Sequence, residues 1–381
     1  MRELLRAPLL AMWCVFLLLM PIYVFSVGLP QLDDFLIVIM TPLVLASWNG
    51  RISRTAIGPA RWLALFTLWV VVVNIAWMLL LSEQHTAMDL RFPLFYIFNA
   101  LVFLLALILH QRYGDQFLRV TLHAVFISVV VQAAVSLLFA RSSPRGTVFF
   151  DNPNQLGYYS LLVACVIALT HRRVQFGALR AGIGLACCAY LALFSASRSA
   201  LAGVGILALL SLVTNPRLII AGSVFALMLS LVGGPVANAF EAMRTRMATP
   251  RIDDQYSFFE ARGYDRIWAN QQYLVLGAGE GAKMRFKEST KMLGHAEIHS
   301  SIGTILFSYG AVGLYMFAMF LWHSIRGLSW RSTFVLVPPL IYATAHQGLR
   351  FTMLWVLLAL FSALKASSTS SRNHAMQAGT S

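Results

Sequence analysis

Apolar segments about as long as a membrane-spanning helix recur along almost the whole chain, and no other sequence feature restricts the fold as strongly. A helix needs about 20 mostly apolar residues to cross the hydrocarbon core of a bilayer. The sequence therefore predicts an all-α polytopic membrane protein with about 12 transmembrane helices. The predicted spans lie at residues 8–28, 34–48, 61–81, 92–110, 117–139, 155–170, 175–194, 199–214, 217–236, 300–324, 333–346 and 350–366.

The composition excludes a water-soluble domain. Of the 381 residues, 59% are hydrophobic and 12% are charged, and a soluble domain of this length cannot bury that much apolar surface. The net charge of +14 would suit a nucleic-acid partner. The basic residues, however, lie in short turns between apolar runs, as membrane topology requires, so we expect no nucleic-acid binding.

The distribution of basic residues predicts that both ends of the chain lie in the cytoplasm. With the amino terminus inside, the inner segments hold fifteen Lys and Arg residues and the short outer connections hold five. The other nine lie in a long outer loop, where the charge rule does not apply. The predicted division is spans one to nine in residues 1–236, the outer loop in 237–299, spans ten to twelve in 300–366, and a disordered inner tail in 367–381. Within the loop, helical stretches are expected around 236–249 and 256–273.

The unusual polar residues all fall on the predicted outer side, several of them where spans six, eight, ten and twelve begin. Each of these spans turns its free N–H groups and its partial positive charge outward. Helix amino ends together with arginines indicate an anion site at the membrane surface. The natural anion there is a diphosphate carried by a lipid. The candidate substrate-binding residues are Arg141, Arg145, Asn152, Asn154, Arg198 and Arg266.

Most of these residues also have a structural interpretation. Asn152-Pro153-Asn154 is typical of a turn and helix cap, but both amides can instead bind sugar hydroxyls or hold a neighbouring arginine. Arg141 and Arg145 can be interfacial anchors that reach lipid head groups.

Arg198 lies in the first turn of a span, where the helix dipole disfavours a cation, so an anionic partner or a head group is expected; Ser197 before it can cap the helix. Arg266 lies beside aromatic residues and suits diphosphate or sugar contacts. The glycine-rich run 277–281 lacks the residues of a P-loop and is predicted to be a flexible turn.

His299 stands where the outer loop enters span ten. A histidine there can be a capped surface residue. Alternatively, the positive end of the helix favours a neutral imidazole, which is the form that a general base for a sugar hydroxyl requires. Gly310 and Gly313 are expected to let a neighbouring helix approach closely. His346 and Arg350 can line the same cavity or can have packing roles. His295, Glu297 and His299 do not have the spacing of a zinc site, so no metal or other cofactor is expected.

The chain resembles the O-antigen ligase and O-antigen polymerase superfamily of bacterial envelope glycan enzymes. The resemblance rests on His299-Ser300 followed after nine residues by Gly310 and then by Gly313, on Ser197-Arg198 before a span, and on Asn152-Pro153-Asn154. It also rests on twelve predicted spans with a large outer loop before His299, and it covers the chain from about residue 120 onward.

This resemblance implies a metal-independent inverting glycosyltransferase in the bacterial inner membrane, with a fold like the multi-span lipid-donor glycosyltransferases and an active site that faces the periplasm. By the match, the donor is an undecaprenyl-diphosphate-linked glycan, His299 deprotonates or orients the acceptor hydroxyl, and Arg198 and Arg266 hold the diphosphate. These groups are then expected to meet in one pocket. The implied partners are an acceptor glycolipid, membrane lipids and a chain-length regulator.

Four functions stay open at this stage, and one of them is a non-catalytic assembly protein for an envelope complex. A polymerase passes the glycan to another lipid-linked repeat unit and is favoured, because no surface dedicated to lipid A-core is evident; a ligase passes it to lipid A-core. A transporter of lipid-linked sugars would need buried charges near the middle of spans and broken helices. The sequence places the charges at one surface, with Asn74 as the main polar exception within a span.

Overall fold

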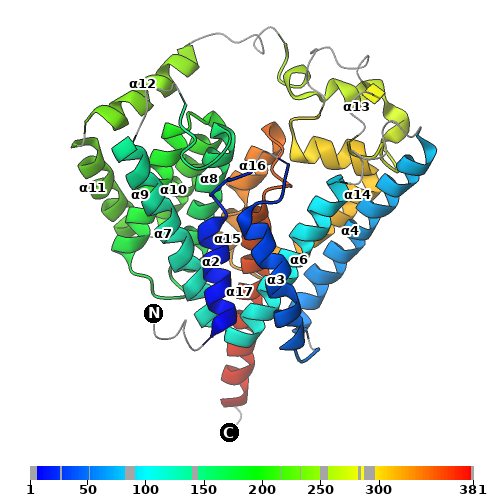
Figure 1. Ribbon diagram of the computed structural model, residues 1–381. Coiled ribbons are helices and arrows are strands. Elements are labelled where there is room, and N and C mark those ends of the chain that lie inside the picture. The colour runs from blue at the N-terminus through cyan, green and yellow to red at the C-terminus, as the bar shows by residue number, and fades with distance from the viewer. Residues whose placement is uncertain are drawn as a thin grey trace. The chain divides into compact units, whose positions relative to one another are not determined.

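The computed structural model describes residues 7–25, 28–50, 52–81, 91–139, 145–214, 216–231, 233–248, 256–281, 285–286 and 297–378, and within these ranges its regular elements are helices (Figure 1). The α-helices are α2 (Pro8–Leu19), α3 (Leu32–Ala46), α4 (Arg54–Leu80), α6 (Arg91–Tyr113), α7 (Asp115–Phe139), α8 (Pro153–Thr170), α9 (Ala178–Phe194), α10 (Arg198–Thr214), α11 (Pro216–Leu231), α12 (Gly234–Ala248), α13 (Asp265–Ala269), α14 (Ser301–Ile325), α15 (Trp330–Phe334), α16 (Val337–Ala345) and α17 (Thr352–Ala378). The short 3-10 helices η3 (Glu260–Arg262) and η4 (Gln271–Tyr273) flank α13.

The chain divides into two compact units. The first contains Met1–Arg51, Leu105–Thr249 and Ser329–Pro339, and the second contains Ile52–Leu104, Pro250–Leu328 and Leu340–Ser381. The predicted outer loop is therefore shared between them: α12 belongs to the first unit, and residues 250–299 belong to the second.

The helices have the composition of a helical membrane protein. Each of the twelve predicted segments contains a helix. Within the described ranges, four helices are long and apolar enough to cross a membrane by length and composition: α4, α6, α7 and α14. On α4, the exposed side chains Leu68, Val72, Ile75 and Leu79 form an apolar stripe at helical spacing. An apolar stripe of this kind is suited to lipid rather than to water.

Several element boundaries differ from the predictions. Helix α2 ends at Leu19 rather than near residue 28, because Pro21 cannot continue a helix. The segment 333–346 contains two short helices, α15 and α16, and the stretch 256–273 contains η3, α13 and η4 in place of one helix. The sequence predicts a disordered tail after residue 366, whereas the backbone continues as α17 to Ala378, because extending a formed helix costs little.

The first unit is built around α8. Nearly every residue of this helix is buried, so it has no polar face, and the neighbouring helices α9 and α10 pack against it. The local sequence fixes where α8 begins. The Asn152 side chain accepts the Gln155 N–H at 3.0 Å, and the Gln155 side chain accepts the Asn152 N–H at 3.3 Å. Pro153 occupies the first turn. The Tyr159 and Ser128 hydroxyls lie 2.8 Å apart and link α8 to α7.

The second unit is built around α4 and α14, which run side by side (Figure 1). Buried aromatic rings from α4, α6 and α14 meet edge to face between them: Phe66, Tyr96 and Tyr309 have ring centroids 5.5 to 6.1 Å apart. The offset geometry is the one that aromatic pairs prefer.

Helix α14 is broken at Gly310, and a loop of the same unit fills the break. Gly310 has φ 68° and ψ −175°, so the regular bonds from Ala311 to Phe307 and from Val312 to Ser308 are not made. Instead, the Ala311 and Val312 N–H groups donate to the carbonyls of Leu274 and Val275, at 2.7 and 3.4 Å. In return, the Phe307 and Ser308 carbonyls accept from the N–H groups of Ala278 and Gly279, at 2.9 Å each. Every backbone group that the break frees in this exchange has a partner, as a membrane interior requires.

Two tryptophans of α4 complete the structure around the break. The Trp69 indole donates to the Tyr309 carbonyl at 2.8 Å, and the Trp77 indole donates to the Gly277 carbonyl at 3.0 Å. The break and the inserted loop are therefore both attached to the helix beside them.

Close approach explains the glycines at this place. A Cβ atom on Gly310 would lie 2.1 Å from the Val275 carbonyl oxygen, and one on Gly277 would lie 2.3 Å from the Ser308 carbonyl oxygen. The prediction that a neighbouring helix approaches both glycines is therefore wrong for Gly310, which the 274–279 loop approaches; at Gly313 the neighbour is Trp69 of α4. The glycine-rich run is not simply a turn, because its backbone is hydrogen-bonded into α14.

We expect Gly310→Ala to lower the free energy of unfolding by about 2–4 kcal/mol, through an unfavourable positive φ and the clash with the loop carbonyl. Gly205→Ala on α10 is the matched control, since a Cβ there meets nothing within 4 Å, and it should be neutral or stabilising. Thermal unfolding of both variants in detergent measures the difference. Equal melting temperatures for the two variants would contradict the tight fit at Gly310.

Candidate functional site

His299 lies at the entry to α14, held by backbone bonds on both sides. It is half-buried, and its N–H donates to the Arg262 carbonyl at 2.9 Å. The next residue, Ser300, is the N-cap of α14: its hydroxyl accepts the Gly303 N–H at 3.0 Å and donates to the Ala343 carbonyl at 3.0 Å. The segment at His299 is therefore fixed by its contact with Arg262, by a helix cap and by the contact of Ser300 with α16.

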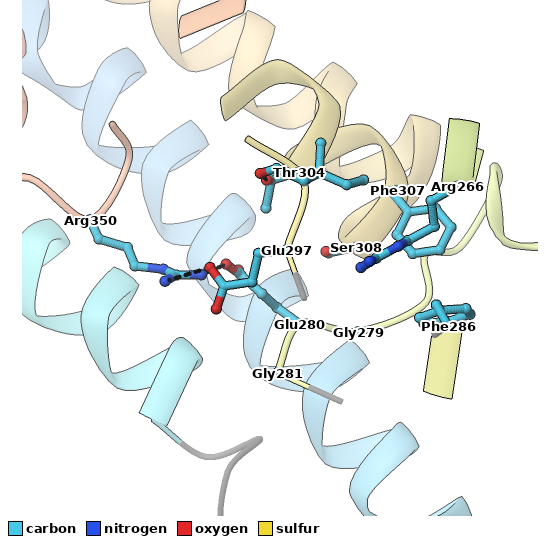
Figure 2. A pocket seen from close by; sticks show the side chains of 11 residues that line it. Arg266, Gly279, Glu280, Gly281, Phe286, Glu297, Thr304, Phe307, Ser308 and Arg350 are labelled. Carbon is cyan, nitrogen blue, oxygen red and sulfur yellow. Dashed lines mark hydrogen bonds and ion pairs between the residues drawn. The ribbon is translucent and has the colours of Figure 1, made fainter. Parts of the chain in front are cut away.

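A polar pocket adjoins this segment in the second unit. Its lining includes Ile298, the residue directly before His299. The polar side chains that line it are Arg266, Glu280, Glu297, Thr304, Ser308 and Arg350, with Phe286 and Phe307 as the apolar part (Figure 2). Two carboxylates, two guanidinium groups and two hydroxyls thus face one space beside the histidine segment.

The Glu280 carboxylate is the most heavily bonded group of the pocket. It is buried, and it accepts the Tyr309 hydroxyl at 2.6 Å and the Tyr96 hydroxyl at 3.1 Å, both on Oε2. Its own N–H donates to Asn74 Oδ1 at 3.0 Å, and the Asn74 amide also donates to the Tyr309 hydroxyl at 3.4 Å. Residues of α4, α6 and α14 therefore meet at Glu280 of the glycine-rich loop, α6 and α14 at its carboxylate and α4 at its N–H.

Arg350 joins the two carboxylates of the pocket. Its Nη2 donates to Glu280 and its Nη1 lies 3.1 Å from Glu297, and Figure 2 shows the side chain directed at both. The guanidinium also lies 4.4 Å from the centroid of the Phe92 ring. Because arginine keeps its proton in proteins, the group remains a cation in this partly exposed position.

Arg266 is the second cation of the pocket. It lies on α13 with only 5% of its surface exposed and stands 5.7 Å from the centroid of the Phe286 ring. Burial lowers the pKa of the Arg266 guanidinium, and the nearby carboxylates of Asp265 and Glu297 oppose that change. The sequence-predicted residues Arg266 and His299 thus belong to the same unit, on the two segments joined by the bond from His299 to Arg262.

In the first unit, the predicted residues Arg145 and Asn154 are in direct contact. The Arg145 Nη2 donates to Asn154 Oδ1 at 2.8 Å, and its Nε donates to the Ser195 carbonyl at 3.1 Å. Asn154 therefore holds a neighbouring arginine, one of the roles that the sequence left open. Asn152 forms the capping box of α8, as its structural interpretation predicted.

Arg198 follows the same turn at the start of α10. Its exposed side chain donates to the Arg246 carbonyl near the end of α12, and the Arg246 side chain donates to the Ala196 carbonyl. The turn at residues 195–198 is therefore contacted by Arg145 from one side and by Arg246 from another. Ser197 does not cap α10, because its hydroxyl is buried and makes no hydrogen bond within the described part of the chain.

The structure thus places the predicted residues in two groups. Arg145, Asn152, Asn154 and Arg198 belong to the first unit, and Arg266 and His299 belong to the second. Arg141 lies outside the described residues. The convergence of the two groups on one substrate stays a prediction.

The sequence does not predict the network of hydrogen bonds and charges around Glu280. Asn74 was noted as a polar residue within a span, and such a residue indicates a buried polar partner. Its partner Glu280 lies in the glycine-rich run, and no sequence motif marks Tyr96 or Tyr309. Arg350 was noted only as a possible lining residue, and the structure places it in the pocket wall.

Among the described residues, no three His, Cys, Asp or Glu side chains lie together as metal ligands would. A catalytic reaction without a metal stays a prediction. No protein-family model matches the chain, and no curated protein matches it.

We expect Glu280→Ala to cost about 3–5 kcal/mol of unfolding free energy, because it removes a buried carboxylate partner of Arg350 and leaves two buried tyrosine hydroxyls without their acceptor. Glu241→Ala is the control: Glu241 pairs with Arg244 at 3.6 Å on the surface, and its loss should change stability by less than about 1 kcal/mol. Denaturation in detergent compares the two variants. Similar losses in both would show that the Glu280 network contributes little.

Proposed function

We propose that the chain is an inner-membrane glycosyltransferase with twelve spans, which moves a glycan from an undecaprenyl-diphosphate donor to an acceptor hydroxyl on the periplasmic face. The observation that supports it most is the position of His299. This histidine precedes the N-cap of a helix long and apolar enough to cross a membrane, and its neighbours Glu297 and Ile298 line a polar pocket. An imidazole at a membrane surface beside hydroxyl, carboxylate and guanidinium groups has the surroundings that proton transfer from a sugar hydroxyl needs.

In the proposed reaction, the neutral imidazole of His299 takes the proton of the acceptor hydroxyl. The hydroxyl oxygen forms a bond to the anomeric carbon of the donor sugar from the face opposite the diphosphate. The bond between that carbon and the diphosphate oxygen breaks, and the lipid diphosphate leaves with the electron pair. The anomeric configuration is therefore inverted, and the proton stays on the imidazole until water or the product removes it.

Arginines carry the electrostatic part of the proposal. Arg198 and Arg266 bind the diphosphate and stabilise the charge that builds on it as it leaves, which a divalent metal does in other transferases. The planar guanidinium group matches two phosphate oxygens at once. Arg145, which Asn154 holds and which donates to the Ser195 carbonyl of the turn before Arg198, adds a further guanidinium group beside that turn.

A polymerase is the favoured form of this activity, and a ligase is the alternative. Both transfer the same donor, and they differ in the acceptor: a second lipid-linked repeat unit for the polymerase and lipid A-core for the ligase. Reconstitution with lipid-linked repeat units, with and without lipid A-core, separates them. A ladder of longer lipid-linked chains identifies a polymerase, and a single transfer to core identifies a ligase.

Two features of the structure also fit a transporter of lipid-linked sugars. That function calls for broken helices and buried charges, and both occur in the second unit, at Gly310 of α14 and at Glu280. Two features favour the enzyme. The chain's own loop fills the break with backbone hydrogen bonds, and Arg350 already neutralises the buried carboxylate.

We expect His299→Ala to lower the rate of glycan transfer by about 100-fold or more, because general base catalysis supplies about that factor. The measurement is chain extension in proteoliposomes that contain the lipid-linked donor. His123→Ala is the matched control: it is an exposed histidine on α7 whose Nδ1 contacts its own helix, and its loss should leave transfer unchanged.

Normal transfer by a folded His299→Ala protein would contradict the base role. Lipid-linked sugar crossing the vesicle membrane, without any new glycosidic bond, would identify the transporter instead.

We expect Arg198→Lys to slow transfer by about 10–100-fold, because an ammonium group cannot make the paired contact with diphosphate oxygens. The measurement is the initial rate of transfer over a range of concentrations of the lipid-linked donor. Arg217→Lys on α11, an exposed arginine on the predicted cytoplasmic side, serves as the control. Unchanged donor affinity and rate in Arg198→Lys would place the diphosphate elsewhere.

A further inference from the structure

One guanidinium group connects two parts of the second unit that are remote in sequence. Arg350 lies between α16 and α17, and its two terminal nitrogens contact different carboxylates, Nη2 that of Glu280 and Nη1 that of Glu297. The side chains of Arg350 and Glu297 are about a quarter exposed, at 25% and 27%, while that of Glu280 is 5% exposed. The contacts are therefore shielded enough from solvent for geometry to matter.

The Glu280 end of this bridge is fixed. The loop that carries Glu280 is bonded into the break of α14 through Ala278 and Gly279, and the carboxylate also accepts from Tyr96 and Tyr309. Through its contact with Glu280, the Arg350 side chain is therefore anchored to the helices of the second unit.

The Glu297 end of the bridge lies two residues before His299. On the other side of the histidine, the Ser301 N–H donates to the His346 carbonyl at 3.1 Å, and the Gly348 N–H donates to the Ser301 hydroxyl at 2.8 Å. The segment 343–350 thus holds the residues before and after His299, through the Arg350 side chain on one side and backbone bonds on the other.

We propose that Arg350 is a positioning residue for His299: by bridging Glu280 and Glu297, it fixes the histidine segment against the helices and sets the direction of the imidazole. This role rests on the proposed function of His299. The role requires the planar guanidinium group of Arg350 in particular, because its two terminal nitrogens can each contact a different carboxylate. A lysine at the same position carries the charge but has one nitrogen, so it can hold one carboxylate firmly and not both.

The test compares Arg350→Lys and Arg350→Gln with Arg331→Lys, a control arginine of the first unit that lies over the Trp330 ring and does not line the pocket. Positioning affects the chemical step more than binding, since a misplacement of about 1 Å costs about 100-fold in rate. We expect kcat of Arg350→Lys to fall about 100-fold, with the KM values of donor and acceptor within about twofold of wild type. Wild-type kcat in Arg350→Lys, or a loss confined to KM, overturns the proposal.

A double-mutant cycle isolates the bridge itself. Glu297→Gln and Arg350→Gln should each lower kcat, and the double variant should lose no more than Arg350→Gln alone, because both remove the same contact. Fully additive losses overturn the proposal.

Hydrogen exchange gives a readout that does not depend on activity. In Arg350→Lys, the amides of His299 and Ser301 should exchange faster than in wild type, while the Gln155 amide at the cap of α8 should not change. Unchanged exchange at His299 and Ser301 overturns the bridge, and faster exchange with wild-type kcat overturns its role in positioning.

The two hypotheses fail in different ways. Full transfer by His299→Ala removes the proposed function and with it the role of Arg350. Lost transfer in His299→Ala together with a normal Arg350→Lys enzyme removes the role of Arg350 alone.

Discussion

The exchange of backbone hydrogen bonds at Gly310 is the constraint on which the second unit depends. Two N–H groups and two carbonyls of α14 give up their partners within the helix and find new ones in the 274–279 loop. In an apolar surrounding, an unpartnered backbone group costs several kcal/mol, so the break and the loop are only stable together. The position of Glu280 follows from this exchange, because the carboxylate comes directly after the two N–H groups that fill the break. The position of the pocket wall beside His299 thus follows from the break of α14 at Gly310.

The buried charges follow the same logic. A lone carboxylate among helices of this polarity would be expensive, and Glu280 is stabilised by two tyrosine hydroxyls and a guanidinium. The guanidinium in turn has two carboxylates and an aromatic face. Glu280, Arg350 and the two tyrosine hydroxyls belong to one connected network, which extends through Arg350 to Glu297, two residues before His299. Stability and the placement of the candidate catalytic group are therefore properties of the same contacts.

The sequence predicted those features that depend on neighbouring residues. Apolar runs of the right length gave the helices, and Asn152 with Pro153 gave the start of α8, because a cap is a local interaction. The contact between Asn154 and Arg145 was foreseen as one of two roles, since only nine positions separate the residues. The Glu280 network was not foreseen, because Tyr96 is 184 positions away from Glu280 and Asn74 is 206 positions away. No periodicity connects such distant residues, and the glycines that allow their meeting also occur in ordinary turns.

The inserted loop also has a consequence for biosynthesis. Residues 274–279 and the α4 residues Trp69 and Trp77 precede α14 in the chain, so these partners of the interrupted helix are synthesised before it. The 274–279 loop and these tryptophans therefore leave the ribosome before α14 does. When α14 is made, the backbone groups and indoles that complete its irregular part are therefore already present in the chain.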